Sequence, residues 1–352
     1  MDVRSLYIIL SFIFIVMSFL PILQFKHWIF RISEYLRLQI LGILCLLLVI
    51  GYCFESENMI LHRATLILIT ISIIHHIIII LPYIRKSNKS FSSPENKVII
   101  LSVNVLQKNQ NYKKLIDIIE EMNPDILLTM ETNQKWENEL SKVESLFSYN
   151  YKIPKENRYG MHLYTKLDVK ECKEHYLISE EHPSIEIRMA DKENNEFIFW
   201  GIHPPPPSPG EKPTSKQKDA ELMKLAKLIR KNQYSTIVVG DFNNVSWSKS
   251  SKMFSKLSNL KDARVRRGIY GTFPAQYWFL RFPVDLLFHS APIIITNLKT
   301  LPAFGSDHLP ILAEFFINKS SSLPKNNLDP KFKEEVNTII EEGKEAAVEE
   351  ND

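Results

Sequence analysis

The hydrophobic pattern divides the chain into an apolar beginning and a longer part of mixed pattern. Three nearly uncharged runs, at 6–23, 38–54 and 64–83, occupy most of residues 1–84. Each is about as long as a helix that spans the hydrocarbon core of a bilayer, which takes roughly 20 residues. A buried core helix is the alternative for any one run, but soluble domains rarely contain three in succession. No small-residue cleavage site follows the first run, so we predict three retained transmembrane helices rather than a signal peptide.

From residue 97 onward, short apolar runs alternate with amphipathic segments. The apolar runs predict strands at 98–103, 125–130, 160–164, 184–189, 197–202, 235–239, 284–288, 293–298 and 311–316. Apolar residues at helical spacing predict helices at 111–122, 136–147, 215–231 and 250–257. Strands outnumber helices and the helices are dispersed, which favours an α+β fold with packed sheets and helices outside them.

Two polar segments border this soluble domain, which runs from 97 to 318. Residues 85–96 are rich in serine and lysine and contain a proline, so they read as a linker. Residues 319–352 are rich in lysine and glutamate and show no core pattern. We expect this last segment to be a solvated helix or, more simply, a disordered tail.

Composition and charge exclude some classes of protein. The net charge of the 352 residues is only +3, which gives no sign of a nucleic-acid-binding surface. One basic cluster, Arg264, Arg266 and Arg267, is expected to be a solvated loop rather than a clamp for DNA. The three cysteines have neither a disulfide pattern nor zinc-ligand spacing.

The basic residues beside the apolar runs predict an orientation. Six lie on the side that also holds the soluble domain, against two on the other side: Lys26, Arg31, Arg37, Arg85, Lys86 and Lys89 against Arg4 and Arg63. The positive-inside rule therefore places the soluble domain in the cytoplasm.

Polar side chains stand at the ends of most predicted strands. The strongest example is the apolar run 235–239, which leads through Gly240 to Asp241 and Asn243. Residues that are two positions apart on an extended segment point to the same side, so Asp241 and Asn243 could address one target together. The alternative is an ordinary turn, since Asp and Asn are common turn residues. The other members of this group are Asn104, Glu131, His203, Asp285, Asp307 and His308. Strands that present such residues at one end would build a single polar cleft.

The chemistry that fits this set is metal-assisted phosphoester hydrolysis. Carboxylate and amide oxygens without thiolates suit Mg²⁺ or Mn²⁺. Such an ion neutralises phosphate charge and helps to generate the attacking hydroxide. A histidine oriented by a carboxylate acts as a general base or stabilises the phosphoryl oxygens. A membrane-bound binding protein that keeps the fold without turnover is the alternative.

The order of these motifs, N…E…H…GDFN…D…SDH, resembles the endonuclease/exonuclease/phosphatase superfamily. Its members include deoxyribonucleases, abasic-site endonucleases, inositol polyphosphate 5-phosphatases and neutral sphingomyelinases. The resemblance covers about 97–317 and implies a four-layer α/β sandwich, two packed sheets flanked by helices, as the catalytic domain. The motifs at 240–243 and 306–310 are its most specific parts.

The resemblance also implies a role for each residue. The family's metal ligands correspond to Asn104, Glu131 and Asp307. Its substrate-binding residues correspond to Asn104, His203 and Asn243. Its catalytic residues correspond to His203, Asp241, Asn243, Asp285 and His308, with Asp285 orienting the histidine.

Two further segments, 203–207 and 271–285, are similar to the membrane-anchored bacterial members, a group that includes a protein associated with teicoplanin resistance. That likeness implies an outward-facing domain, in conflict with the charge count, so the side of the membrane stays open. A departure is the leucine after Asp285, where many members have histidine or an aromatic residue. A hydrolase tethered beside a bilayer favours a lipid-linked or small phosphoester, with DNA cleavage as the alternative. The aromatic residues at 273–282 would lie in the core or at the membrane interface.

Overall fold

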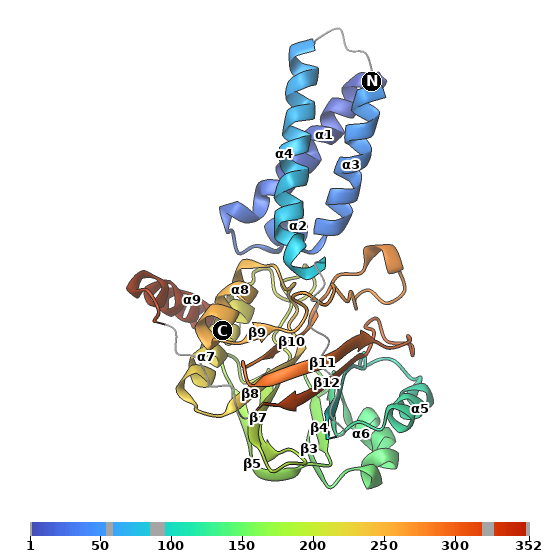
Figure 1. The fold of residues 1–352 in the computed structure, drawn as a ribbon, viewed down its shortest axis with the longest axis vertical. Helices are drawn as coiled ribbons and strands as arrows, with labels where there is room; N and C mark the ends of the chain where they lie inside the picture. Colours follow the sequence, from blue (N-terminus) through green and yellow to red (C-terminus); the bar gives the residue numbers. More distant parts are fainter. Residues whose placement is uncertain (1, 54–58, 85–95, 319–326, 350–352) are drawn as a thin grey trace.

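The computed structural model describes residues 2–53, 59–84, 96–318 and 327–349. Figure 1 shows apolar helices standing on one side of a two-sheet sandwich. The expected linker lies, apart from Asn96, outside the described residues. The N-terminal elements are α1 (Val3–Phe19), η1 (Leu20–Leu23), α2 (Trp28–Tyr35), α3 (Arg37–Cys53) and α4 (Met59–Ile84).

Two of these helices are long and apolar enough to cross a membrane. The first is α1 continued by η1, Val3–Leu23, with 21 residues. The second is α4, Met59–Ile84, with 26 residues. The second predicted span is α3, which has 17 residues and forms with α2 a pair bent by 71°. If that bent pair is one span, the described residues contain three candidate spans; the second predicted span, 38–54, is not long enough by itself in the described residues and stays a prediction.

The remaining chain forms two six-stranded sheets packed face to face. The first has the order β11-β12-β1-β2-β4-β3 and the second the order β5-β6-β7-β8-β10-β9. The strands of the first sheet are β1 (Val98–Asn104), β2 (Ile126–Met130), β3 (Tyr149–Ile153), β4 (Met161–Thr165), β11 (Ile293–Thr300) and β12 (Ile311–Ile317). Those of the second are β5 (Asp168–Tyr176), β6 (Pro183–Ala190), β7 (Glu196–Ile202), β8 (Ser235–Asp241), β9 (Lys261–Asp262) and β10 (Asp285–His289).

Helices cover the outer faces and complete four layers. The first sheet is covered by α5 (Tyr112–Met122), α6 (Gln134–Leu140) and η2 (Ser141–Leu146). The second is covered by α7 (Lys216–Lys231) and α8 (Lys249–Ser258), and α9 (Pro330–Val348) packs against α7. Buried side chains such as Leu128, Phe199 and Phe315 fill the space between the sheets. The predicted four-layer sandwich is confirmed.

Two parallel strand pairs determine where the polar strand ends meet. In the first sheet β1 runs parallel to β2, and in the second β7 runs parallel to β8. The carboxyl ends of a parallel pair lie at the same edge of the sheet. The two pairs therefore bring Asn104 beside the residue after β2, Glu131, and the residue after β7, His203, beside Asp241.

Gly240 allows the end of strand β8 to lie close to the backbone of β7. Its φ is +152°, and an added Cβ would lie 1.9 Å from the carbonyl oxygen of Ile202 on β7. A side chain does not fit in that space, and residues other than glycine rarely adopt that φ. The glycine in the motif at 240–243 thus has a structural reason that is independent of chemistry.

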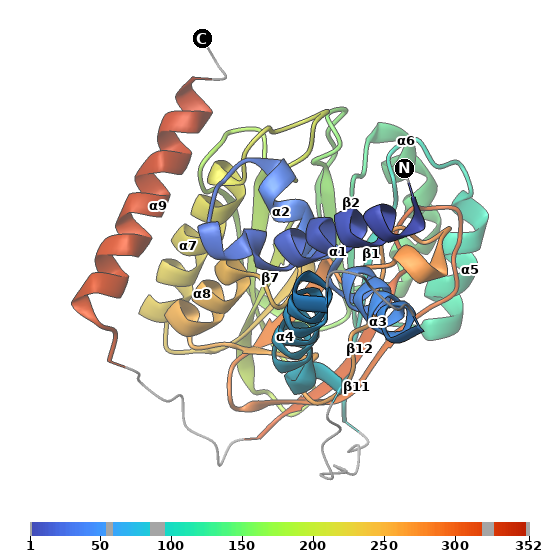
Figure 2. The ribbon, with the colours of Figure 1, turned by 90° about the horizontal axis from the view of Figure 1, so that it is seen from above.

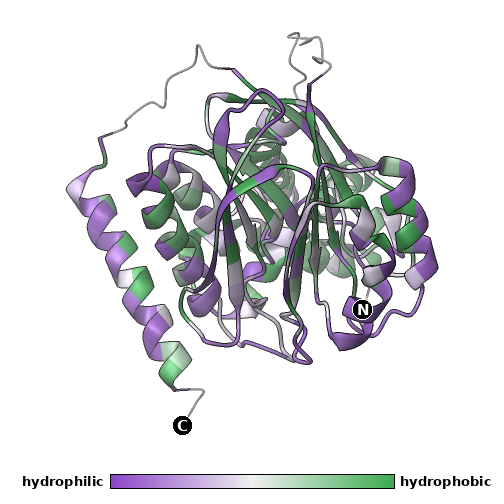
Figure 3. Ribbon diagram, turned by 90° about the horizontal axis from the view of Figure 1, so that it is seen from below, coloured by the Kyte–Doolittle hydropathy of each residue, from purple (hydrophilic) through white to green (hydrophobic). Residues whose placement is uncertain are grey.

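Residues 330–348 form a helix, as one of the two expectations for this segment had it, but the disordered alternative is wrong for them and the helix is not fully solvated. They form α9, whose apolar residues Phe332, Val336 and Ile340 are buried against the helical layer of the second sheet. Figure 3 shows hydrophobic and hydrophilic positions alternating along this helix, which ends near the C-terminus. The solvent face of the helix carries many glutamates and lysines. The average composition of the segment is therefore polar and does not show the apolar face.

Three strands were not predicted, namely β3, β5 and β9. The strand β5 lies at the edge of its sheet, and most of its residues are exposed or half-buried. Its sequence therefore lacks the apolar alternation by which a strand is recognised. The predicted helix at 136–147 is instead α6 followed by the 3-10 helix η2.

Candidate active site

Asn104 connects the two sheets at the edge where the parallel pairs end. Its side-chain Nδ2 donates to Glu131 Oε1 at 3.0 Å and to Asp241 Oδ2 at 3.2 Å. The other carboxylate oxygen of Glu131 accepts from the backbone N–H of Gln107 at 3.1 Å. Glu131 has φ +61°, a left-handed conformation that turns its side chain away from the path of β2. Residues predicted on three different strands thus form one hydrogen-bonded group.

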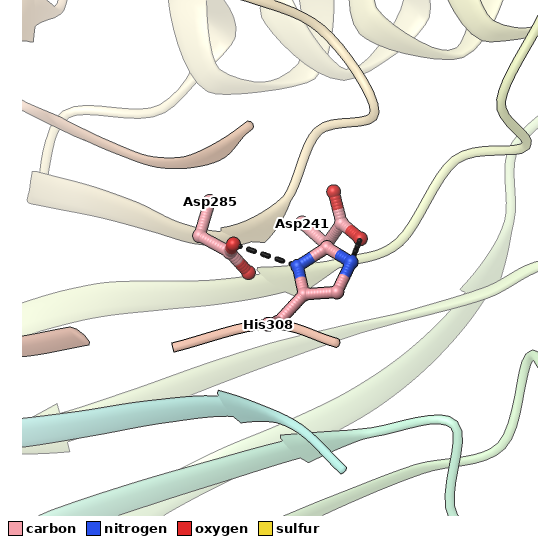
Figure 4. A group of neighbouring side chains, drawn as sticks. All are labelled: Asp241, Asp285 and His308. Carbon is pink, nitrogen blue, oxygen red and sulfur yellow. Dashed lines mark hydrogen bonds and ion pairs between the residues drawn. The ribbon is translucent and has the colours of Figure 1, made fainter. Parts of the chain in front are cut away.

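Asp241, Asp285 and His308 form a second group, shown in Figure 4. His308 Nδ1 lies 2.8 Å from Asp285 Oδ2, and its Nε2 lies 3.6 Å from Asp241 Oδ2. The strand register explains this arrangement, because Asp285 on β10 pairs directly with Asp241 on β8. The ring of His308 is held at one nitrogen and presents the other toward Asp241.

His203 approaches the same carboxylate from the other side. Its Nε2 lies 3.7 Å from Asp241 Oδ2, and the ring packs near the ring of Tyr159 with centroids 5.2 Å apart. Its buried Nδ1 has no hydrogen-bond partner within the described part of the chain. Asp241 Oδ2 therefore faces two imidazoles and one amide.

Asn243 differs from the expectation for an extended segment. Its φ is +47°, so it does not point to the same side as Asp241 by simple alternation. Its backbone N–H donates to Asp241 Oδ1 at 2.9 Å, and its side-chain Nδ2 donates to the carbonyl of Pro204 at 3.0 Å. Asn243 lines the cavity described below, but its amide nitrogen holds the proline-rich loop.

Burial and nearby negative charge raise the pKa values of two carboxyl groups in the site, those of Asp241 and Asp307. Burial raises the pKa of Asp241, and Asp285 adds to this effect while His308 and His203 oppose it. Burial likewise raises the pKa of Asp307, and the nearby Glu131 adds to it while His308 opposes it. Burial works against a charged His308, but Asp285 and Asp241 outweigh it and raise its pKa to about 10. The site gathers more negative charge than its histidines offset.

Such a group of oxygen ligands fits a divalent cation. Carboxylate and amide oxygens are the ligands preferred by Mg²⁺ and Mn²⁺, and a cation would relieve the repulsion between the buried acids. Asp241, Asp285 and His308 form a group that could hold such an ion, because their ligand atoms all lie within 4.8 Å of one another. That grouping differs from the predicted ligands Asn104, Glu131 and Asp307. Hydrogen bonds occupy oxygens of both sets, since Asp285 Oδ2 lies 2.8 Å from His308 Nδ1 and both carboxylate oxygens of Glu131 accept hydrogen bonds, so the predicted ligand set stays a prediction.

A cavity of about 540 Å³ opens onto both groups. Its polar lining includes Glu131, His203, Asp241, Asn243, Asp307 and His308. Of the eight predicted residues, Asn104 and Asp285 lie behind this surface, where they hydrogen-bond to Asp241 and His308. The structure thus brings all eight predicted residues together.

The pattern of strand ends missed several residues of this cavity. Arg158 and Tyr159 come from the turn before β4, where no apolar strand precedes them. The cavity also contains side chains of α2, far away in the sequence. No local pattern links these segments to the strand ends, so only the tertiary structure reveals them.

The prediction of a solvated loop at the basic cluster is wrong for Arg264. Its side chain is fully buried, and its guanidinium donates to the backbone carbonyls of Asp285 and of Ile269. Burial lowers the pKa of Arg264, and Asp262 and Asp285 oppose that effect. The arginine supports the strand that carries Asp285 and is not available to bind DNA.

Comparison with known proteins identifies likenesses for the sandwich. A family model described as "Endonuclease/Exonuclease/phosphatase family" matches residues 101–308. No curated protein matched the sequence. The resemblance to the bacterial membrane-anchored members therefore stays a prediction.

Solved structures share the fold at low identity. The human Nocturnin catalytic domain with bound sulfate has a TM-score of 0.52 at 17% identity, over 64% of this chain and 97% of that one. The D. rerio TDP2 complex with a single-strand DNA product has a TM-score of 0.54 at 14% identity, over 63% and 100%. A family protein from Bacteroides thetaiotaomicron has a TM-score of 0.52 at 17% identity, over 67% and 100%. At these identities the likeness shows the fold alone.

Proposed function

The chain belongs to the endonuclease/exonuclease/phosphatase family, and on this premise we propose that it is a membrane-anchored phosphoester hydrolase that depends on Mg²⁺ or Mn²⁺. Metal-dependent hydrolases are found in this family. The observation that carries the proposal is the convergence of Asp241 with Asn104, His203 and His308 on one cavity. A protein that had kept only the fold would not need to preserve this complete set.

We assign the metal ligands from the family resemblance and the other roles from the resemblance together with the geometry. Asn104, Glu131 and Asp307 would hold the cation, which when bound offsets phosphate charge and lowers the pKa of water. Asp241 would orient the attacking water and accept its proton. His203 and Arg158 would contact the phosphate, while Asn243 would shape the loop beside it.

Hydrolysis then needs little further chemistry from the protein. The water oxygen forms a bond to phosphorus as the ester P–O bond breaks, Asp241 accepts the proton of the water, and the departing oxygen takes up a proton from the solvent. His308 would stabilise the phosphoryl oxygens through Nε2, because Asp285 fixes the ring through Nδ1. Most of the rate enhancement would come from this positioning of charge and hydrogen-bond donors.

The substrate class follows from the surroundings of the site. A lipid-linked or small phosphoester is favoured, because apolar helices would hold the hydrolase at a bilayer. DNA is the second candidate, supported by the TDP2 structure with its DNA product. Arg158 is the only lysine or arginine among the described residues that line the cavity, which disfavours a polyanionic substrate.

The proposal is tested with the full-length protein in detergent. We expect it to hydrolyse bis-p-nitrophenyl phosphate when Mg²⁺ or Mn²⁺ is present and to stop when EDTA is added. Restoring the metal should restore the rate. Activity that persists in EDTA would rule out the metal-dependent mechanism.

Metal binding gives a prediction that does not rely on turnover. Mn²⁺ at about 100 times its Kd should stabilise the folded protein by about 2.7 kcal/mol, because it binds only the folded state. The matching rise in the thermal unfolding midpoint should vanish in Glu131→Gln. The control Glu121→Gln, an exposed position on α5, should keep the full rise. An unchanged rise in Glu131→Gln would remove this residue from the metal site.

Orientation is a separate prediction. The charge rule gives a cytoplasmic domain, so alkaline phosphatase fused after residue 90 should be inactive, while green fluorescent protein fused there should fluoresce. Active phosphatase would instead agree with the likeness to the outward-facing bacterial members.

A further inference from the structure

One wall of the catalytic cavity belongs to the N-terminal apolar region. Trp28, Ile32, Tyr35 and Leu36 line it from α2 and the residue after it. These positions follow the spacing i, i+4, i+7 and i+8, so they form a single face of the helix. Phe273, Phe282 and Val284 line the cavity together with them. The site therefore combines a polar floor with an apolar wall.

Specific contacts hold α2 in this place. The buried Arg31 bonds with Nη2 to Asp219 Oδ2 of α7 at 3.3 Å and with Nη1 to Glu34 Oε2 at 3.2 Å. Trp247 Nε1 donates to the carbonyl of Glu34 at 2.7 Å. Figure 2 shows α2 lying over the sandwich near α7 and β7. A buried ion pair with such partners fixes the orientation of the helix, so the cavity-facing side is set by the structure.

The helix also touches the catalytic strand end directly. Tyr35 Oη donates to the backbone carbonyl of Asn243 at 2.6 Å. Its ring packs edge-on against Phe282, with centroids 5.6 Å apart. The apolar wall is therefore continuous with the residues that surround Asp241.

The same side of the molecule carries features of a membrane surface. Trp278 and Phe279, in η3 (Trp278–Leu280), are 78% and 57% exposed. Gln39 of α3 donates to the carbonyl of Phe279 at 3.0 Å, which places this loop beside the start of a candidate span. Figure 1 shows the loop in orange beside the lower end of α3. Exposed tryptophan and phenylalanine at such a position suit the lipid–water interface.

From these observations we propose that the cavity has a subsite for a hydrocarbon chain, formed by Trp28, Ile32 and Leu36. The substrate is then an amphiphilic phosphoester, with its phosphate at the polar floor and the first part of its chain against α2. This inference rests on the proposed hydrolase function and narrows its substrate class. Ile32 is 38% exposed, so its side chain is free to contact a ligand. The helix α2 meets α3 at a bend of 71°, so this wall adjoins the start of a candidate span.

The test compares two substrates that differ only in chain length. Ethyl p-nitrophenyl phosphate and octyl p-nitrophenyl phosphate release the same product, and both are assayed with the full-length protein in one detergent. We expect kcat/KM to be at least about tenfold higher for the octyl ester. Ile32→Ser should lower kcat/KM for the octyl ester about tenfold and leave kcat/KM for the ethyl ester unchanged. The octyl-to-ethyl ratio of kcat/KM therefore falls about tenfold.

A matched control lies on the same helix. Ile29 is 49% exposed and is not among the residues that line the cavity. Ile29→Ser should keep the wild-type ratio, which excludes altered partitioning of the octyl ester into micelles. If Ile32→Ser does not fold, Ile32→Trp fills the cavity from the same position and should also lower the ratio.

The outcomes separate this inference from the proposed function. No hydrolysis of either ester with metal present would reject the hydrolase itself. Equal kcat/KM for both esters, or equal losses on both in Ile32→Ser, would reject the chain subsite alone. Faster cleavage of supercoiled DNA than of the octyl ester, unchanged in Ile32→Ser, would assign the cavity to nucleic acid instead.

Discussion

Asp241→Asn should lower kcat for bis-p-nitrophenyl phosphate by about 10³-fold while KM changes little. The substitution keeps the size of the side chain but removes the charge that faces Asn104, His203 and His308. Proton transfer by a positioned side chain contributes about 10²–10⁴-fold to a rate, and the amide cannot accept the proton of water. The measurement is steady-state hydrolysis at saturating Mg²⁺ or Mn²⁺.

A control separates chemistry from folding. Asp117→Asn, an exposed position on α5, should keep the wild-type kcat. The unfolding midpoint of Asp241→Asn should change little, because the loss of one of the two hydrogen bonds that Asp241 accepts is offset by removal of a buried charge that burial opposes. A kcat of Asp241→Asn within threefold of the wild-type value would contradict the proposed role of Asp241.

Gly240→Ala should destabilise the fold by about 2–4 kcal/mol. The added Cβ would overlap the carbonyl of Ile202 at 1.9 Å, and the φ of +152° is strained for any residue with a side chain. The strands β7 and β8 must separate to relieve the overlap, which would also displace Asp241. For a domain of this size the loss corresponds to a fall of roughly 5–15 °C in the unfolding midpoint.

Gly210 provides the matched position for this experiment. An added Cβ there meets no atom within 4 Å. Gly210→Ala should therefore unfold at the wild-type temperature. Equal midpoints for the two variants would show that the approach of β8 to β7 does not depend on the glycine.

The strand ends could be predicted because their signal is local. An apolar run such as 235–239 must be buried, and the polar residue that follows it must lie where the strand emerges. Parallel pairing then brings these ends to one edge, whichever strands are neighbours. For this reason the sequence identifies Asn104, Glu131, His203 and Asp241 without information about their partners.

Other parts of the site had no local signal. Asn243 departs from simple alternation because its φ is positive, and Arg158 follows no apolar run. The composition of residues 330–348 gives no sign of burial, because most of these residues lie on the face that α9 turns to solvent. The edge strand β5 was missed because little of it is buried.

The amino-acid sequence by itself determined the apolar helices, nine of the twelve strands of the two sheets, and the eight polar residues of the site, since burial and backbone geometry act over a few neighbouring residues. Only the tertiary structure decided that α2 forms a wall of the catalytic cavity. That contact depends on an ion pair between Arg31 and Asp219, 188 residues apart. Hydrophobic periodicity reports whether a residue is buried and not against which partner, so the partner appears only when the whole chain is folded.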